Sequence, residues 1–158
     1  AAAQNRVLPV IKAALARASG CAHTILYRTE NVVEKVREIT NGRGVDVAYD
    51  SVGKDTFVGS LQSLAMRGHL VNFGQSSGPI EPFSITTLFE KSNSVSRPNV
   101  FHYFTEPNRD SMAKILFAAL ADRVITADHH HEYAFDNVSK AHADMEARKT
   151  AGAVLLIP

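Results

Sequence analysis

Short β-prone runs alternate with stretches of helical apolar spacing along this chain of 158 residues, and this alternation constrains the fold more than any other feature. The runs that predict strands are 24–27, 45–49, 69–73, 94–97 and 153–157. The stretches that predict helices are 9–18, 31–39, 55–65, 85–91, 110–121 and 136–148. Parallel neighbouring strands need a connection of about a dozen or more residues, which a helix provides. The sequence therefore predicts one α/β domain over residues 1–158, with a mostly parallel sheet.

Two of the expected helices carry more specific predictions. Asn31 and Glu34 form a pattern typical of a helix start, in which the first side chain caps the free backbone amides. In the stretch 110–121, Met112, Ile115, Leu116 and Ala119 recur at helical spacing. We expect this second set to face inward.

Composition and charge exclude several classes of function. The formal net charge is +1, and basic and acidic residues are interleaved, so the chain has no basic stripe for nucleic acid. No apolar run approaches the roughly 20 residues that span a bilayer, so a membrane role is not expected. Cys21 is the single cysteine and cannot form an internal disulfide, which makes a cytoplasmic setting the default. We interpret Cys21 as a small packing residue.

Small and hydroxyl-bearing residues follow several expected strands. In open α/β sheets, ligands bind outside the carboxyl ends of the strands. The segments at these ends are Tyr27 to Thr29, Asp50 to Gly53 and Gly74 to Gly78. Glycine lets a ligand approach the backbone, and hydroxyl groups form hydrogen bonds, which suits a nucleotide. Turn chemistry explains any one of these segments alone. Their repetition at one sheet edge favours a nucleotide site that includes Ser51, Val52 and Gly53.

The glycine-rich fingerprint that binds pyrophosphate is not found after any expected strand. Gly42-Arg43-Gly44 precedes a strand instead of following one, so we interpret it as a turn. If the chain has a dinucleotide-binding fold, its first strand, glycine-rich turn and following helix are therefore expected to be missing.

Sequence blocks in a fixed order reveal a family resemblance over about residues 12–158. The blocks are 12–18, 25–28, 36–40, 42–46, 49–56, 73–79, 96–98, 146–148 and 155–158. Together they resemble bacterial quinone oxidoreductases of the zeta-crystallin-like branch, in the medium-chain dehydrogenase/reductase superfamily. Residues 1–11 do not match this pattern, Leu26 replaces an asparagine common in the family, and Gln75 stands where asparagine is frequent.

The resemblance implies a doubly wound, Rossmann-like cofactor domain in which NADPH donates a hydride to a quinone or a related electron-poor carbonyl compound, without catalytic zinc. It also implies that the N-terminal substrate domain is absent and that about residues 124–158 return toward it. The isolated chain is then expected to be inactive, and we assign it no catalytic residue. A different class remains open: a non-catalytic nucleotide-binding or assembly module.

The resemblance assigns roles to individual residues. Lys12, Tyr27 and Arg148 match positions around the adenosine 2′-phosphate, where charged and hydroxyl donors suit a dianion. Alternatively, these are solvated helix residues and a half-buried strand residue. The loop beside the nicotinamide is matched by Phe73, Gly74, Gln75 and Ser76.

The resemblance also bears on assembly. The segment Ser94 to Arg97 resembles the strand through which family members form homodimers. The alternative is an edge protected by Arg97 and Pro98, since charge and proline both discourage strand pairing.

Histidines and carboxylates cluster between Asp128 and Glu132, so a metal site must be weighed. On a strand, His129 and His131 would share one face, but two ligands fall short of the three or four that zinc uses. We expect a solvated loop or edge here and no metal.

Overall fold

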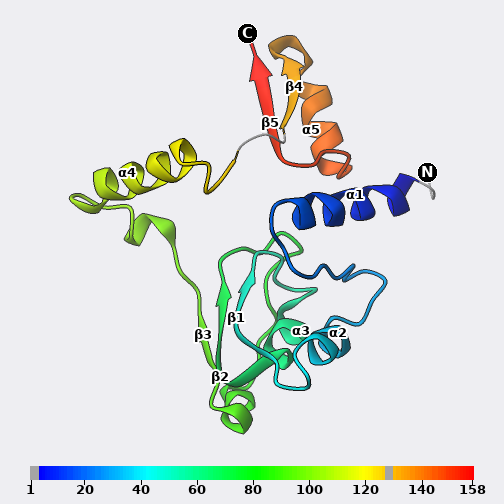
Figure 1. Cartoon of the computed structure of the whole chain (residues 1–158), viewed down its shortest axis with the longest axis vertical. Helices are drawn as coiled ribbons and strands as arrows, with labels where there is room; N and C mark the ends of the chain where they lie inside the picture. The colour runs from blue at the N-terminus through cyan, green and yellow to red at the C-terminus, as the bar shows by residue number, and fades with distance from the viewer. Residues whose placement is uncertain (1–3, 127–129) are drawn as a thin grey trace. The chain divides into compact units, whose positions relative to one another are not determined.

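The computed structural model describes residues 4–126 and 130–158. The chain forms two compact units, one over residues 23–105 and the other over 1–22 together with 106–158 (Figure 1). Each unit is described by itself. Within the described residues, no helix combines the length and apolar character that crossing a bilayer requires.

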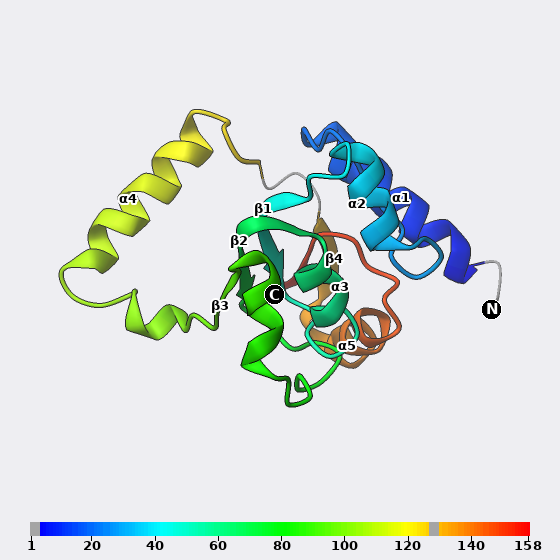
Figure 2. The ribbon, with the colours of Figure 1, turned by 90° about the horizontal axis from the view of Figure 1, so that it is seen from below.

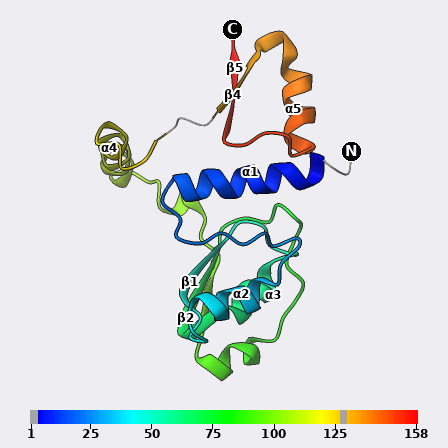
Figure 3. The ribbon, with the colours of Figure 1, turned by 45° about the vertical axis from the view of Figure 1, so that its right-hand side comes forward.

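The 23–105 unit is built around a three-stranded parallel sheet in the order β1-β2-β3. Its elements are α2 (Val32–Ile39), β1 (Val45–Asp50), α3 (Phe57–Gln62), β2 (Leu64–Asn72), the 3-10 helix η1 (Ile85–Lys91), β3 (Ser94–Ser96) and the 3-10 helix η2 (Val100–His102). The helix α3 lies against β1 and β2, and α2 lies beside α3 (Figure 3). The predicted α/β fold with a parallel sheet is confirmed.

Local sequence explains the boundaries of α2. Asn31 caps its start, because the Asn31 side chain accepts hydrogen bonds from the backbone N–H groups of Val33 and Glu34 at 3.1 and 3.3 Å. After the helix, Gly44 has a φ of +84°, and a Cβ there would lie 2.7 Å from the Ser63 carbonyl oxygen. Glycine is therefore required at this position, and the interpretation of Gly42-Arg43-Gly44 as a turn is confirmed.

The core of this unit lies between α3 and the sheet. Phe57 and Leu61 of α3 pack with Leu64 and Leu70 of β2, and both β2 leucines are fully buried. This cluster packs α3 onto β2.

The second unit contains a two-stranded parallel pair, β4 (His130–Ala134) with β5 (Ala153–Ile157). Its other elements are α1 (Gln4–Ala18), α4 (Asn108–Ala121), the 3-10 helix η3 (Phe135–Asn137) and α5 (Val138–Glu146). α5 packs against both strands (Figures 1 and 2), and Ala141 is buried there. The histidine-rich segment from 130 onward is thus a strand, which the sequence did not predict.

The segment 24–27, expected to be a strand, is irregular and leads into a turn. The Leu26 carbonyl accepts hydrogen bonds from the backbone N–H groups of Thr29 and Glu30 at 2.8 and 2.9 Å. A strand needs a paired neighbour for its backbone groups. In the part of the chain that the structure describes, no strand pairs with this segment or with the outer edge of β1.

Two predictions about burial are wrong. Met112, Ile115 and Leu116 on α4 are 40%, 71% and 51% exposed, so no described element covers that face of the helix. Cys21 is exposed, because it follows the end of α1 and lies outside the core.

Candidate functional site

The candidate site lies where β1 and β2 end beside each other. Asp50 and Asn72 are register partners at the carboxyl ends of these parallel strands. The loops that follow, Ser51 to Gly53 and Phe73 to Gly78, therefore meet at one sheet edge, as the sequence predicts. Each contains residues assigned to the cofactor.

Asp50 organises the first loop through its side-chain carboxylate. The residue is buried, with 4% of its surface exposed. Its Oδ1 accepts hydrogen bonds from the backbone N–H groups of Val52 and Gly53 at 2.8 and 3.0 Å. The Thr56 hydroxyl donates to the same carboxylate at 2.9 Å, and the Ser60 hydroxyl donates to Oδ2 at 3.0 Å. The loop is thus wrapped around one charged group.

These donors also determine the charge state of Asp50. Burial by itself raises the pKa of the carboxyl, because desolvation penalises the charged form. The amides of Gly53 and Val52, together with the Thr56 and Ser60 hydroxyls, outweigh burial and hold the pKa of Asp50 below its ordinary value. The group is therefore a carboxylate at neutral pH.

Direct hydrogen bonds join the second loop to the first. Ser77 donates from its backbone N–H and its hydroxyl to the Val52 carbonyl at 2.9 and 2.7 Å. The Ser76 N–H donates to the Ser51 carbonyl at 3.3 Å. The two predicted cofactor loops consequently form one hydrogen-bonded layer.

Gly74 allows this close approach. A Cβ at position 74 would lie 2.5 Å from the Ser51 carbonyl oxygen, a distance that side-chain atoms do not tolerate. The Asn72 side chain links the end of β1 to the second loop, because its Nδ2 donates to the carbonyls of Asp50 and Gly74 at 3.3 and 3.0 Å. Any larger residue at position 74 would separate the loops.

The outer surface of this layer carries aromatic and polar groups. Phe73 is 53% exposed, and Ser51, Gln75 and Ser76 are exposed as well. A phenyl ring offers a flat apolar face, while hydroxyl and amide groups offer hydrogen bonds. The combination suits a ligand that has a ring and polar substituents.

The remaining predicted residues lie elsewhere. Tyr27 belongs to the 23–105 unit, where it is 46% exposed at the start of a turn. Lys12 on α1 and Arg148 after α5 are exposed residues of the other unit. Because the three residues belong to different units, their convergence on a phosphate stays a prediction.

The histidine-rich segment uses its side chains in local contacts. His131 Nε2 accepts a hydrogen bond from the Ala151 N–H at 3.0 Å, and His130 Nε2 lies 3.0 Å from Glu132 Oε1. His129 lies outside the described residues. Across residues 4–126 and 130–158, no group of three or more histidine, cysteine, aspartate or glutamate side chains could hold a metal ion.

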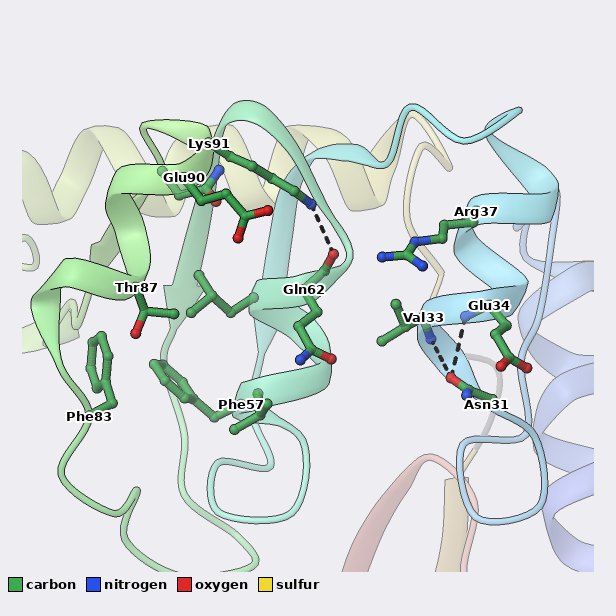
Figure 4. A pocket seen from close by; sticks show the side chains of 13 residues that line it. Asn31, Val33, Glu34, Arg37, Phe57, Gln62, Phe83, Thr87, Glu90 and Lys91 are labelled. Atoms are coloured by element: carbon green, nitrogen blue, oxygen red, sulfur yellow. Dashed lines mark hydrogen bonds between the residues drawn. The ribbon is translucent and has the colours of Figure 1, made fainter.

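A separate hollow of about 590 Å³ lies over α3, between α2 and η1 (Figure 4). Its apolar lining includes Phe57, Leu61 and Phe83. Lys91 lines it too, but its Nζ donates to the Gln62 and Leu64 carbonyls at 3.2 and 2.8 Å. None of the predicted cofactor-binding residues lines this hollow.

Sequence reasoning did not assign roles to Asp50, Thr56 and Ser60. An aspartate at a strand end with glycine three residues later is a signal for a side chain that bonds the following backbone amides. The contribution of Ser60 depends on where α3 lies, and the local sequence carries no sign of it.

Glycine- and hydroxyl-bearing loops at the carboxyl edge of a parallel sheet are typical of nucleotide-binding α/β domains. The family model described as zinc-binding dehydrogenase matches residues 19–156, and the chain belongs to this family. The resemblance seen in the sequence is thereby confirmed.

Individual relatives agree with this assignment. The chain is 39% identical over 149 residues to a quinone oxidoreductase of Pseudomonas aeruginosa, covering 93% of this chain and 46% of that protein. It is 38% identical over 150 residues to a 2-haloacrylate reductase of a Burkholderia species, covering 93% of this chain and 45% of the relative. The chain thus spans about half the length of the curated relatives it matches.

A solved structure extends the comparison to the fold. The structure of Escherichia coli quinone oxidoreductase complexed with NADPH matches with a TM-score of 0.85 at 39% identity. The match covers 92% of this chain and 46% of that one. The Rossmann-like fold, present in part, is confirmed.

Proposed function

We propose that this chain is the cofactor-binding part of an NADPH-dependent oxidoreductase, with residues 1–158 forming a truncated dinucleotide-binding domain. The observation that carries the proposal is the single layer formed by the Ser51 to Gly53 and Phe73 to Gly78 loops at the carboxyl edge of β1 and β2. The named relatives are reductases, and the Escherichia coli structure holds NADPH.

The exposed groups of this layer fit a dinucleotide. NADPH, when bound, supplies the hydride. Phe73 offers a flat ring for the nicotinamide, and Ser51, Gln75 and Ser76 offer hydrogen bonds to its polar substituents. The backbone of Val52, Gly53 and Gly74 positions these side chains.

Lys12, Tyr27 and Arg148 are proposed to bind the 2′-phosphate. Two cations and a phenol hydroxyl provide charge-assisted hydrogen bonds to a dianion. NADH has no such phosphate, so these residues would make the protein prefer NADPH.

The proposal includes no zinc, following the family resemblance. The family description mentions zinc, yet the described residues include no group of ligands that fits the ion. That hydride transfer proceeds without zinc is proposed on the family resemblance alone.

The acceptor is proposed to be a quinone or a related electron-poor carbonyl compound in the cytoplasm. The relatives named for quinones and for 2-haloacrylate both support an alkene conjugated to a carbonyl group. The test compares NADPH oxidation by the isolated chain with that by a longer protein that contains it, called the parent protein. We expect quinone-dependent turnover in the parent and none in the chain, because hydride transfer requires donor and acceptor in contact. Absence of turnover in the parent with both acceptor types would contradict the proposal.

The parent is further proposed to form a homodimer through β3. In the described part of the chain, β3 is an outer strand of its sheet and can pair with a second copy. Arg97 is exposed, and its Nη1 donates to the Asn72 carbonyl at 3.0 Å, a contact within its own chain that leaves the backbone edge of β3 available for pairing. Light scattering should report a dimer, and a monomer at high concentration would contradict this assignment.

A further inference from the structure

We propose that Asp50 is a positioning residue that holds the Ser51 to Gly53 and Phe73 to Gly78 loops together as one preformed wall of the cofactor site. The loop-positioning role stands on the geometry of this chain, while its effect on cofactor affinity rests on the proposed function. Neither the family match nor the relatives' names assign a role to this side chain.

The Asp50 carboxylate lies in a buried, polar environment. Asp50 is 4% exposed, and the ion pairs of the described residues do not include it. Four neutral donors surround it: two backbone amides of its own loop and two hydroxyls from Thr56 and Ser60. A buried charge held in this way keeps the loop in a single conformation, because moving the loop would leave the charge without partners.

Hydrogen bonds connect the loop held by Asp50 to the neighbouring loop. With the amides of Val52 and Gly53 fixed, the Val52 carbonyl points at Ser77, which donates to it twice. The backbone carbonyl of Asp50 also accepts the Phe73 N–H at 2.9 Å. The Asp50 side chain therefore acts on the second loop through the Val52 carbonyl and Ser77, while the backbone carbonyl of Asp50 holds the exposed Phe73.

Two substitutions separate hydrogen bonding from charge. Asp50→Asn keeps an acceptor oxygen for the Val52 and Gly53 amides, and its new amide can donate to the Thr56 and Ser60 hydroxyl oxygens. Asp50→Ala removes every acceptor and leaves the loop amides unpaired. If Asp50 positions the loops through hydrogen bonds, Asp50→Asn should change loop protection and NADPH binding little, whereas Asp50→Ala should reduce both strongly.

Two controls separate positioning from general destabilisation. Leu64→Ala removes a fully buried side chain at the opposite end of β2, far along the strand from the loops, and lowers stability without touching them. Asp46→Ala removes an exposed carboxylate of β1 that is paired with Arg43. All variants are compared at a temperature where each is folded by circular dichroism.

The first measurement is amide hydrogen exchange in the isolated chain, which needs no cofactor. Asp50→Ala should accelerate exchange at Ser76 and Ser77 by about tenfold or more, the change expected from losing bonds to a charged acceptor. Leu64→Ala should leave these amides protected relative to the strands, and Asp50→Asn should restore protection to within about threefold. Equal acceleration throughout the 23–105 unit in Asp50→Ala and Leu64→Ala would overturn the proposal.

The second measurement is NADPH binding to the parent protein. Asp50→Ala should weaken it about tenfold, Asp50→Asn no more than about threefold, and both controls should leave it unchanged. If the unsubstituted parent does not bind NADPH but Asp50→Ala still accelerates amide exchange in the second loop, the proposed function is contradicted and the loop-positioning role is supported. If NADPH binds equally to the Asp50→Ala and Leu64→Ala proteins, positioning for the cofactor is overturned while the proposed function stands.

Discussion

The two units bury side chains of different kinds. In the 23–105 unit, Phe57, Leu61, Leu64 and Leu70 form a buried apolar cluster. In the unit of 1–22 and 106–158, the buried residues among those described are Ala141, Asp144 and Thr150. The first unit holds its site on a packed core, whereas the second relies more on polar contacts.

The two buried aspartates show the same contrast. Asp50 is surrounded by neutral donors from its own loop and from α3. Asp144 instead accepts hydrogen bonds from Lys140 and Lys149 at 2.6 and 3.2 Å and from the Tyr133 hydroxyl at 3.2 Å. The neutral donors around Asp50 fix the geometry of a buried site. The interaction of Asp144 with its exposed lysine partners can instead be altered by salt and pH.

The largest expected effect tests where the apolar core lies. Leu64→Ala should lower the free energy of unfolding by about 2–5 kcal/mol, because it leaves a cavity in a packed core. Ile115→Ala on α4, where the side chain is 71% exposed, should change it by no more than about 0.5 kcal/mol. Urea unfolding followed by circular dichroism measures both, and equal losses would remove the contrast between the units.

A smaller effect is expected from glycine substitutions. Gly74→Ala places a methyl group against the Ser51 carbonyl and should cost about 1–3 kcal/mol, as overpacking does. Gly59→Ala on α3 is the matched control: its Cβ would lie 4.0 Å from Val33 Cγ2. The control should be neutral or stabilising by about 0.5–1 kcal/mol. If Gly74→Ala melted at a higher temperature than Gly59→Ala, the close contact between position 74 and the Ser51 carbonyl would be contradicted.

The pH dependence of the second unit should follow Asp144. Hydrogen bonds from Lys140 and Lys149 lower the pKa of Asp144 from 3.8 to about 2. A lowered folded-state pKa stabilises the protein fully above the unfolded value, and the contribution disappears as pH falls from about 4 through about 2. The difference in melting temperature between the unsubstituted chain and Asp144→Asn should shrink over that window. A difference that stays constant would mean that the lysine contacts do not matter.

Structural features that depend on neighbouring residues could be predicted from the sequence, whereas features that depend on distant residues could not. The Asn31 cap and the turn at Gly44 depend on residues within a few positions, so the sequence was sufficient for both. The strand expected at 24–27 depends on a paired neighbour, which no local pattern supplies. β4 was not predicted for the same reason, because it pairs with β5, a segment well separated from it in the chain.

The candidate site followed the same division. Its loops were recognisable from glycine and serine after two strands, and the structure joins them. The bonds of Asp50 to the Val52 and Gly53 amides had a local signal, but its link to the second loop was not recognisable, because it requires Ser60 to be brought back by α3 and Ser77 to be brought in by β2. The phosphate-binding residues came from resemblance and await a direct test.

The most direct test of NADPH binding compares two arginines in the parent protein. Arg148 and Arg123 are both exposed, follow a helix and have a positive φ, of 57° and 54°. Arg148→Ala should weaken NADPH binding by roughly tenfold or more and leave NADH binding nearly unchanged, since only NADPH carries the 2′-phosphate. Arg123→Ala should change neither, and higher salt should reduce the Arg148 effect. Equal loss of both cofactors in Arg148→Ala would contradict the assignment of a phosphate pocket.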